Sequence, residues 1–385
     1  MAKHYEDEGI PFLRSLNIKP FKIISDDMKY VSAEFSNSLS KSILHKGDVV
    51  IVRTGIPGTC CVVPAEYDGC NCSDVVIVHP NTELVNPHYL AAYINFWGQR
   101  QIQNNKVGAI QQHFNVHSAE EMLIFLPDIT EQEKIAKTIV ALNGKIENNF
   151  SVCVELEAMA KTLYDYWFTQ FDFPDENGKP YCSSGGEMVW NDQLKRKIPK
   201  GWSAGQLSDI ANITMGQSPS GDTYNENGSG TIFYQGCTDF GTRFPVPRVY
   251  TSAPTRFAKA GDILMSVRAP VGTLNIAMED CCIGRGLAAL NSKFGSQLHL
   301  LYTLSGFKQL FDVMDGNGTT FGSITKDTLF EMKVVIPRRD QIKSFEEMVQ
   351  PIEQKIRITE QENRELTKLR DWLLPMLMNG QAAVE

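Results

Sequence analysis

The sequence predicts an α/β (α+β) protein with two globular mixed α/β parts, separated by two long helices that form an antiparallel coiled coil. Two observations predict this architecture: the chain contains a pseudo-twofold internal repeat, and each copy ends in a long run of heptad-spaced apolar residues. The length of 385 residues supports it, because a single domain usually has roughly 100–200 residues.

The internal repeat places matching residues 210 to 221 positions apart. Residues 126–127 (Leu-Pro) match residues 336–337 (Ile-Pro), and residues 47–50 (Gly-Asp-Val-Val) match residues 261–264 (Gly-Asp-Ile-Leu). Nearer the start, residues 9–12 (Gly-Ile-Pro-Phe) resemble residues 230–233 (Gly-Thr-Ile-Phe). A few small insertions explain the drift in spacing, so each copy is a globular part followed by a helical part.

The repeat divides the chain into six segments. They are a first globular part (residues 1–128), a first long helix (129–170), a linker (171–200), a second globular part (201–337), a second long helix (338–380) and a tail (381–385). The linker is assigned by its content of Gly, Pro, Ser and charged residues, which are typical of connecting segments.

The two helical segments share one apolar seam, in which the steps alternate between four and three residues. The seam positions are Ile135, Ile139, Leu142, Ile146, Leu156 and Leu163 in the first helix, and Phe345, Val349, Ile352, Ile356, Leu366 and Leu373 in the second. Residues 128–130 provide capping side chains for the first helix. Two amphipathic helices packed on separate domains are the alternative, but the repeat favours one antiparallel pair.

The globular parts have the short β-rich runs and turns of mixed α/β domains. We expect strands at residues 48–53, 74–78, 122–126, 263–267 and 332–336. Asn86 and Pro87 form a helix start, with Asn as the N-cap and Pro in the first turn. The apolar face of that helix comprises Leu90, Tyr93, Ile94 and Trp97.

Composition excludes several classes of protein. No run of about 18 apolar residues exists, so we expect no transmembrane helix. The polar, acidic first residues resemble neither a signal peptide nor a transit peptide, and nine cysteines without secretory context indicate reduced thiols. These features predict a cytoplasmic protein. The net charge of −8 argues against an indiscriminate nucleic-acid coat.

The sequence provides only weak evidence for a catalytic site or a metal site. Residues 86–89 (Asn-Pro-His-Tyr) faintly resemble the Asn-Pro-Pro-aromatic loop of amino-methyltransferases, but the second proline is missing. No phosphate-binding Gly-x-x-x-x-Gly-Lys-Ser/Thr loop is present. Cys60, Cys61, Cys70 and Cys72 could suggest zinc, but adjacent cysteines are poor tetrahedral partners, and packed strand cysteines are the better interpretation.

Several short motifs around the linker resemble specificity subunits of Type I restriction–modification enzymes. They are Phe-Asp-Phe-Pro at 171–174, Gly-Lys-Pro-Tyr at 178–181, Ser-Gly-Gly at 184–186, Ile-Pro-Lys-Gly-Trp at 198–202, Leu-Ser-Asp-Ile at 207–210, Gly-Asp-Ile-Leu at 261–264 and Ser-Val-Arg at 266–268. Together, on a twofold repeat with two long helices, these motifs cover nearly the whole chain.

The resemblance implies a chain without its own active site, within a methyltransferase and ATP-dependent endonuclease complex (Type I site-specific deoxyribonuclease). Residues 1–128 and 201–337 would be target-recognition domains, each reading one half of a bipartite site on double-stranded DNA. The helices would set the spacer and dock two methyltransferase subunits, and two restriction/translocase subunits would join. S-adenosylmethionine, ATP and magnesium would bind these partners, with no cofactor or metal in this chain. No membrane partner is expected.

The first recognition domain departs from the second at its start. About 28 residues separate Trp202 from Gly230, whereas only residues 1–8 precede Gly9. We therefore expect the first domain to be N-terminally incomplete.

Candidate DNA-facing residues follow from chemistry, because Arg, Lys, Asn, Gln, Ser, Thr and His side chains in loops can reach bases or phosphates. In the first domain they are Arg14, Asn17, Lys19, Arg53, Thr54, Gln111, Gln112 and His113. In the second they are Gln235, Thr238, Arg243, Arg268, Thr319, Thr320 and Ser323. Each could instead belong to an ordinary solvated loop.

Two other functions remain open on the sequence: a stand-alone DNA-modifying enzyme, and a coiled-coil scaffold without a DNA role. The absent catalytic motifs count against the first. A sequence-selective footprint would exclude the second.

Overall fold

The computed structural model describes residues 2–98, 101, 115–308, 311 and 323–381. The chain divides into two compact units, here called unit 1 (Met1–Ser151 with Gln361–Glu385) and unit 2 (Val152–Glu360). Each unit contains one globular part and a portion of both long helices. This differs from a division into separate globular and helical segments, because apolar residues of each helix portion pack in the same core as the neighbouring globular part.

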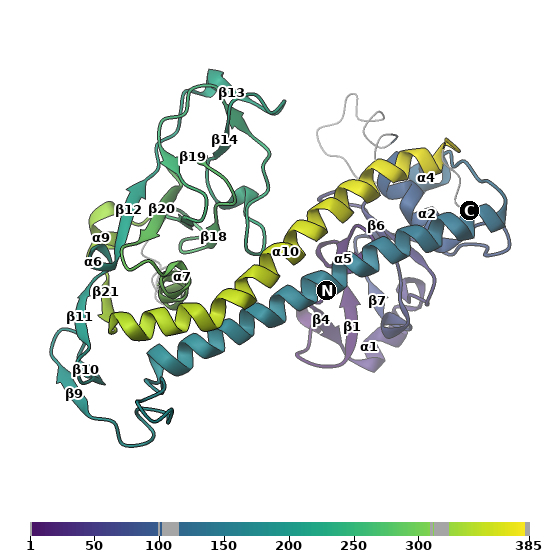
Figure 1. Ribbon diagram of the computed structural model, residues 1–385. Coiled ribbons are helices and arrows are strands. Elements are labelled where there is room, and N and C mark those ends of the chain that lie inside the picture. The colour runs from purple at the N-terminus through teal and green to yellow at the C-terminus, as the bar shows by residue number, and fades with distance from the viewer. Residues whose placement is uncertain (1, 99–100, 102–114, 309–310, 312–322, 382–385) are drawn as a thin grey trace. The chain divides into compact units, whose positions relative to one another are not determined.

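The two long helices are α5 (Ile129–Tyr164) and α10 (Arg339–Met378), with 36 and 40 residues (Figure 1). Asp128 caps α5, since its Oδ1 accepts a hydrogen bond of 2.9 Å from the Glu131 amide. Helix α5 is followed by a π-helical turn at Asp165–Thr169. Both helices lie within the segments expected from the sequence, residues 129–170 and 338–380.

Within each unit the two helices run antiparallel. In unit 1, Arg370 Nη1 donates to Asn143 Oδ1 at 3.1 Å, and Asn149 Nδ2 donates to Glu362 Oε2 at 2.8 Å. In unit 2, Cys153 lies against the Ile356 carbonyl, while the rings of Tyr164 and Phe345 are 5.9 Å apart. In both units, later residues of α5 meet earlier residues of α10.

The predicted heptad seam is buried or half-buried at every position. The buried members are Ile135, Ile139, Phe345, Val349 and Ile356, and the half-buried ones are Leu142, Ile146, Leu156, Leu163, Ile352, Leu366 and Leu373. Two polar residues, Asn149 and Thr359, are also buried in the seam. The seam prediction is confirmed.

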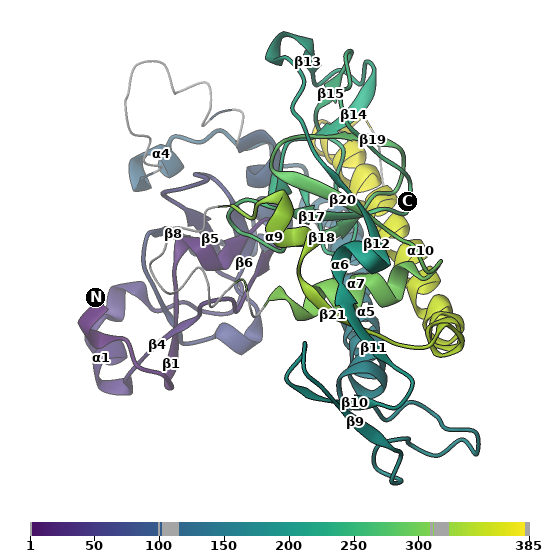
Figure 2. The same ribbon diagram turned by 90° about the vertical axis from the view of Figure 1, so that its left-hand side faces the viewer.

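The globular part of unit 2 contains two main sheets and short helices (Figure 2). A four-stranded sheet has the order β12 (Ala211–Met215), β20 (Leu287–Ser292), β17 (Ile263–Ser266) and β18 (Leu274–Ile276). A five-stranded sheet has the order β13 (Tyr224–Asn225), β15 (Tyr250–Thr251), β14 (Thr231–Tyr234), β19 (Cys281–Ile283) and β16 (Phe257–Ala258). The helices are α6 (Leu207–Ile210), α7 (Gln297–Gly306) and α9 (Lys326–Phe330).

The globular part of unit 1 has smaller sheets with related pairing. They are β4 (Lys29–Val31), β1 (Ile10–Leu13) and β7 (Asn71–Cys72); β6 (Cys60–Val62), β5 (Val49–Val52) and β8 (Val75–Val78); and β2 (Ile18–Lys19) with β3 (Lys22–Ile23). The helices are α1 (Ala33–Ser38), α2 (Pro87–Tyr93) and α4 (Val116–Glu120). Asn86 caps α2 as predicted, since its Oδ1 accepts from the His88 and Tyr89 amides.

Strand pairing confirms the internal repeat. Strand β1 runs parallel to β7, with Phe12 opposite Asn71, and β14 runs parallel to β19, with Phe233 opposite Cys282. Both central strands after the Gly-Asp turn, β5 and β17, lie between two antiparallel neighbours. The repeated residues thus occupy equivalent positions in the two units.

One predicted strand is wrong. Residues 332–336 do form a strand, β21 (Lys333–Ile336), which pairs with β11 (Ser203–Gln206), but residues 122–126 form none. Residues 122–126 have no strand partner among the described residues, and a strand needs a partner for its backbone groups. Instead, the Gln101 side-chain amide bonds both the amide and the carbonyl of Leu123, at 3.2 and 2.8 Å.

The linker is more structured than its composition predicts. Within it, β9 (Met188–Asn191) and β10 (Arg196–Pro199) form a hairpin, visible in both views (Figures 1 and 2). Phe171 and Phe173 are buried against Trp202, with ring centroids 5.5 and 5.1 Å away. These aromatic contacts hold the segment on unit 2, which Gly and Pro content could not reveal.

The clustered cysteines pack inside unit 1. Cys61, Cys70 and Cys72 belong to one apolar core, and burial raises the pKa of each thiol to about 12. Cys60 is buried between β6 and α2, and its thiol donates to the Ala91 carbonyl. The packed-cysteine interpretation is confirmed. Among the described residues, no helix is both long enough and apolar enough to cross a bilayer.

Candidate nucleic-acid interface

The loop after β19 in unit 2 lies directly against the loop after β14. The Gly284 amide donates to the Tyr234 carbonyl at 2.8 Å, and the Gly286 amide donates to the Gln235 carbonyl at 3.2 Å. A Cβ atom at Gly284 or Gly286 would lie within 2.9 Å of Gln235 backbone atoms. Only glycine permits this approach, so two glycines place residue 285 beside Gln235.

Two further loops lie next to the loop after β19: residues 267–268 contact it directly, and residues 323–324 contact residues 267–268. The Val267 amide donates to the Gly286 carbonyl at 2.9 Å, and the Ile324 amide donates to the Val267 carbonyl at 2.8 Å. An isolated β-bridge then pairs Arg268 with Ser323. The structure thus brings together Gln235, Arg268 and Ser323, one residue from each candidate location in the second domain.

Two exposed arginines that sequence reasoning missed belong to this arrangement. Arg285 lies between the two glycines, and its amide donates to the Ser218 hydroxyl at 3.2 Å. Arg256 precedes β16, and its carbonyl accepts from the Ile283 amide at 2.9 Å. We call Arg256, Arg268 and Arg285 the arginine platform. The Gly-Arg-Gly sequence at 284–286 could have indicated Arg285. Glycines on both sides allow a close approach of the backbone, which places the arginine at the loop tip.

The arginine platform is a concentration of uncompensated positive charge in an acidic chain. All three side chains are exposed, and within the described residues none forms an ion pair. A guanidinium offers five donors in a fixed plane, which fits phosphate oxygens and the O6 and N7 atoms of guanine. Gln235 and Thr238 are also exposed and add neutral hydrogen-bonding groups.

Arg243, another candidate, has a different role. Its side chain is 4% exposed and lies between two glutamates, with Nη1 3.3 Å from Glu157 Oε1 and Nη2 3.2 Å from Glu353 Oε2. Nη2 also donates to the Tyr302 hydroxyl at 3.0 Å. Burial alone would lower the pKa of Arg243, but Glu353, Tyr302 and Glu157 together raise it. We therefore remove Arg243 from the DNA-facing candidates.

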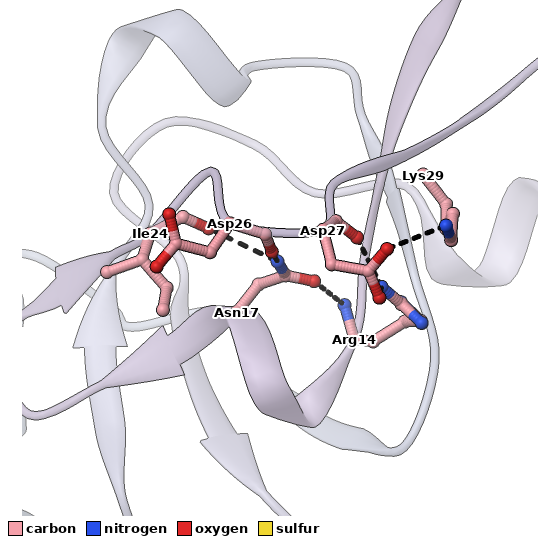
Figure 3. A network of polar contacts seen from close by, with 6 residues as sticks. All are labelled: Arg14, Asn17, Ile24, Asp26, Asp27 and Lys29. Atoms are coloured by element: carbon pink, nitrogen blue, oxygen red, sulfur yellow. Dashed lines mark hydrogen bonds and ion pairs between the residues drawn. The ribbon is translucent and has the colours of Figure 1, made fainter. Parts of the chain in front are cut away.

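In unit 1, Arg14 and Asn17 form a closed polar network (Figure 3). Asn17 is fully buried: its Nδ2 donates to the Ile24 and Asp26 carbonyls, and its Oδ1 accepts from the Arg14 amide. Arg14 Nη2 forms an ion pair with Asp27 at 2.9 Å. Asn17 thus fastens a loop and is removed from the candidates, and the charge of Arg14 is already paired.

Asp27 lies at the centre of this network. Lys29 Nζ approaches Asp27 Oδ1 at 2.7 Å, on the other side of the carboxylate from Arg14. Hydrogen bonds from Lys29 and Arg14 lower the pKa of Asp27 to about 2. The carboxylate therefore remains charged across physiological pH and compensates two cations, which leaves this edge of unit 1 less positive than the platform of unit 2.

The other candidates in unit 1 are accessible. Lys19 and Arg53 are exposed, and Thr54 is half-buried. The Arg53 amide donates to the Asp74 carbonyl at 3.1 Å. Asp74 lies in the loop after β7, which is the counterpart of the loop after β19 that contains Arg285. Unit 1 therefore presents an acid where unit 2 presents a base.

Five candidates lie outside the described residues: Gln111, Gln112, His113, Thr319 and Thr320. Within the described ranges, no three His, Cys, Asp or Glu side chains converge in a way that could hold a metal ion.

Comparison with known proteins gives a consistent result. Residues 199–368 match the family model described as "Type I restriction modification DNA specificity domain". The chain therefore carries a type I restriction–modification DNA specificity domain at residues 199–368. The match includes β11 to β21 with all three platform arginines, and most of α10.

Individual relatives cover almost the whole chain. The putative type I restriction enzyme MjaX specificity subunit of Methanocaldococcus jannaschii is 29% identical over 396 residues, which span 100% of this chain and 90% of the relative. The HindI specificity subunit of Haemophilus influenzae is 23% identical, over 92% of this chain and 91% of the relative. The crystal structure of the type I S subunit from M. genitalium shares the fold, with a TM-score of 0.55, 16% identity and coverage of 98% and 91%.

Proposed function

We propose that this chain is the non-catalytic DNA-specificity subunit of a type I restriction–modification complex, in which each recognition domain reads one half of a bipartite target. The arginine platform is the observation that supports this most directly. Three exposed guanidinium groups without carboxylate partners, on loops held by backbone hydrogen bonds, are suited to contact base edges and phosphates.

The partners follow from the family. A specificity subunit acts with methyltransferase and restriction subunits, and we propose two of each around this chain. S-adenosylmethionine, ATP and magnesium would bind those partners. The overall charge of −8 agrees with shared DNA binding, because an acidic subunit cannot neutralise many phosphates alone.

The helices are proposed to set the distance between the two half-sites. A helix of 36 residues, as in α5, is about 54 Å long at a rise of about 1.5 Å per residue. That length corresponds to roughly 16 base pairs of B-DNA at about 3.4 Å each. Two short specific blocks separated by unspecified pairs would fit such a spacing.

The test is selection of a random DNA pool by the full chain, co-purified with its methyltransferase subunits. We expect enrichment of two fixed blocks around an unspecified gap. A variant with Arg256, Arg268 and Arg285 all changed to Ala should lose the second block. Lys195→Ala, which removes one exposed positive charge from the β9–β10 hairpin, is the control and should retain both blocks. Selection without any enriched block would overturn the proposal.

A further inference from the structure

In each unit, one loop of the globular part contacts both long helices through a cation and a phenylalanine ring. In unit 2 these residues are Arg243 and Phe244, and in unit 1 they are Phe21 and Lys22. We call these two pairs the unit 2 anchor and the unit 1 anchor. At the offset of 221 that relates residues 9–12 to residues 230–233, Lys22 falls on Arg243, so the two cations occupy matching positions of the repeat.

The unit 2 anchor is deeply buried. Arg243 bridges Glu157 of α5 and Glu353 of α10, and it also bonds Tyr302 of α7. Phe244 is 1% exposed, and the Arg357 guanidinium of α10 lies 5.6 Å from its ring centroid. One loop therefore touches three helices, and of these partners Glu353 is 13% exposed and Glu157 is 37% exposed.

The unit 1 anchor uses the same chemistry at the surface. Lys22 Nζ lies 2.7 Å from Glu147 Oε2 of α5, and the Arg370 guanidinium of α10 lies 5.4 Å from the Phe21 ring centroid. The Lys22 and Glu147 side chains are 42% and 49% exposed. Exposed ion pairs of this kind contribute little to stability.

The unit 2 anchor has a third contact, with Tyr302 of α7, that the unit 1 anchor lacks, because one residue differs between α7 and α2. Tyr302 lies six residues after the N-cap Ser296 of α7, and the equivalent position after Asn86 in α2 is Ala92. Ala92 is buried in the core with Tyr89 and Ile135 and provides no hydroxyl group. Beside the unit 1 anchor lies a pocket of about 320 Å³, lined by Phe21, Lys22, Ala91, Glu147 and Arg370 among others.

We infer that Arg243 is a positioning residue for DNA reading, which holds the second recognition domain in a fixed orientation on the helix pair, whereas Lys22 holds the first domain weakly. The inference rests on the proposed function. The bridge from Arg243 to two helices fixes both the tilt and the height of the loop. Of the two long helices in the described part of the chain, Lys22 contacts only α5, through an exposed ion pair with Glu147 and the ring of Phe150 at 5.4 Å, which leaves its loop freer to move.

The consequence is specific to the spacing of the target. Arg243 does not touch DNA, so its loss should leave the preferred bases unchanged. A recognition domain free to tilt on its helices would accept half-sites at more than one distance. The discrimination between the best spacer and one that is longer or shorter by one base pair should therefore fall.

The test uses the same selection with DNA pools of defined spacer length. The main variant is the double substitution Arg243→Met with Glu353→Gln, because removing the arginine alone would leave the largely buried Glu353 without its ion-pair partner Arg243. We expect its spacer discrimination to fall about tenfold, since slight misplacement of a positioned group has effects of this order. Arg243→Lys should restore most of the discrimination, and Lys22→Met, the matched control, should change it less than about twofold.

The outcomes separate this inference from the proposed function. Unchanged spacer discrimination in a double variant with native thermal stability would overturn the inference and leave the function intact. Loss of the preferred bases together with the spacing would also overturn it, because a general loss of structure would then explain the effect. If the double variant does not fold, Glu353→Gln alone weakens the contact of Arg243 with α10, and unchanged spacer discrimination in that variant decides against the inference. Absence of selective enrichment by the unmodified protein would overturn the proposed function itself.

Discussion

The environment of each arginine decides its role in this chain. Arg243 and Arg268 are 25 positions apart, yet one is buried between two carboxylates and the other is exposed without an ion pair among the described residues. Residue type predicted the same role for both. Burial depends on contacts with α5, α7 and α10, far away in sequence, so no local pattern could separate them.

Substitution of Arg268 tests the platform one residue at a time. Arg268→Ala should weaken modification through the second half-site, by roughly 1–3 kcal/mol if the guanidinium forms a bidentate pair with a base. Methylation at limiting enzyme, mapped over a genome, measures this. If Arg268 contacts only phosphate, methylation should fall evenly across sequences. Wild-type methylation would assign Arg268 a structural role.

His299 should make the stability of unit 2 depend on pH. It is buried against Phe168, with ring centroids 4.7 Å apart, and burial lowers its pKa to about 4. Because the unfolded chain takes up this proton near pH 6.5 and the folded chain only near pH 4, stability is complete above pH 6.5 and falls as the pH decreases toward 4. The loss should approach roughly 3 kcal/mol.

Comparison of denaturant unfolding for the wild type and His299→Phe between pH 4 and 7.5 isolates this effect. His299→Phe should remove the contribution of His299, so the free energy of unfolding of this variant should fall less between pH 6.5 and pH 4 than that of the wild type. Glu346 and Glu353, whose pKa values are raised by burial, act in the opposite direction and remain in both proteins. Parallel curves for the two proteins would contradict the assignment.

At the scale of elements, the long helices could be predicted well and the closing strand of unit 1 could not. The seam is a local pattern, repeated every seven residues, so its burial follows from the sequence alone. The strand at residues 122–126 has the same local pattern as β21, but β21 depends on β11, more than a hundred residues away. Strand formation requires a partner, and periodicity does not reveal whether one is present.

Lengthening both helices tests their role in spacing. Inserting four residues after Asn149 and four after Thr359 extends each helix by about 6 Å and nearly preserves its facing side. We expect the recognised spacer to grow by one or two base pairs while both specific blocks remain the same. Methylome mapping of the variant provides the measurement. Retained activity with the original spacer would show that the helices do not determine the distance.

At the scale of the whole molecule, the excess of acidic residues limits what the chain does alone. With a net charge of −8, we expect weak DNA binding by the isolated chain. The logarithm of its affinity should change less steeply with salt than that of the complex, since each neutralised phosphate adds about 0.9 to the slope. Fluorescence anisotropy over a salt series compares the two. Equal slopes for the isolated chain and the complex would mean that this chain makes all the phosphate contacts, which would contradict the prediction.

Cofactor binding separates a specificity subunit from a complete enzyme. We expect neither S-adenosylmethionine nor ATP to bind the isolated chain, because its sequence has no phosphate-binding loop of the known type. Isothermal titration calorimetry with each compound tests this, and the complex with methyltransferase subunits is the positive control for S-adenosylmethionine. Saturable one-to-one binding to the chain alone would favour the enzyme hypothesis.

The loop that places Arg285 in unit 2 and Asp74 in unit 1 has a consequence for how such a protein can change its target. Equivalent strand pairs support both positions, and the charge differs in sign between them. Main-chain contacts hold these loops: strand pairing in both units and two close glycine contacts in unit 2. These contacts do not depend on which side chain extends from the loop. On the proposed function, substitutions at Arg256, Arg268 and Arg285 would change the recognised bases of the second half-site. Such substitutions could be inherited and could diversify the recognised sequence without changing the fold.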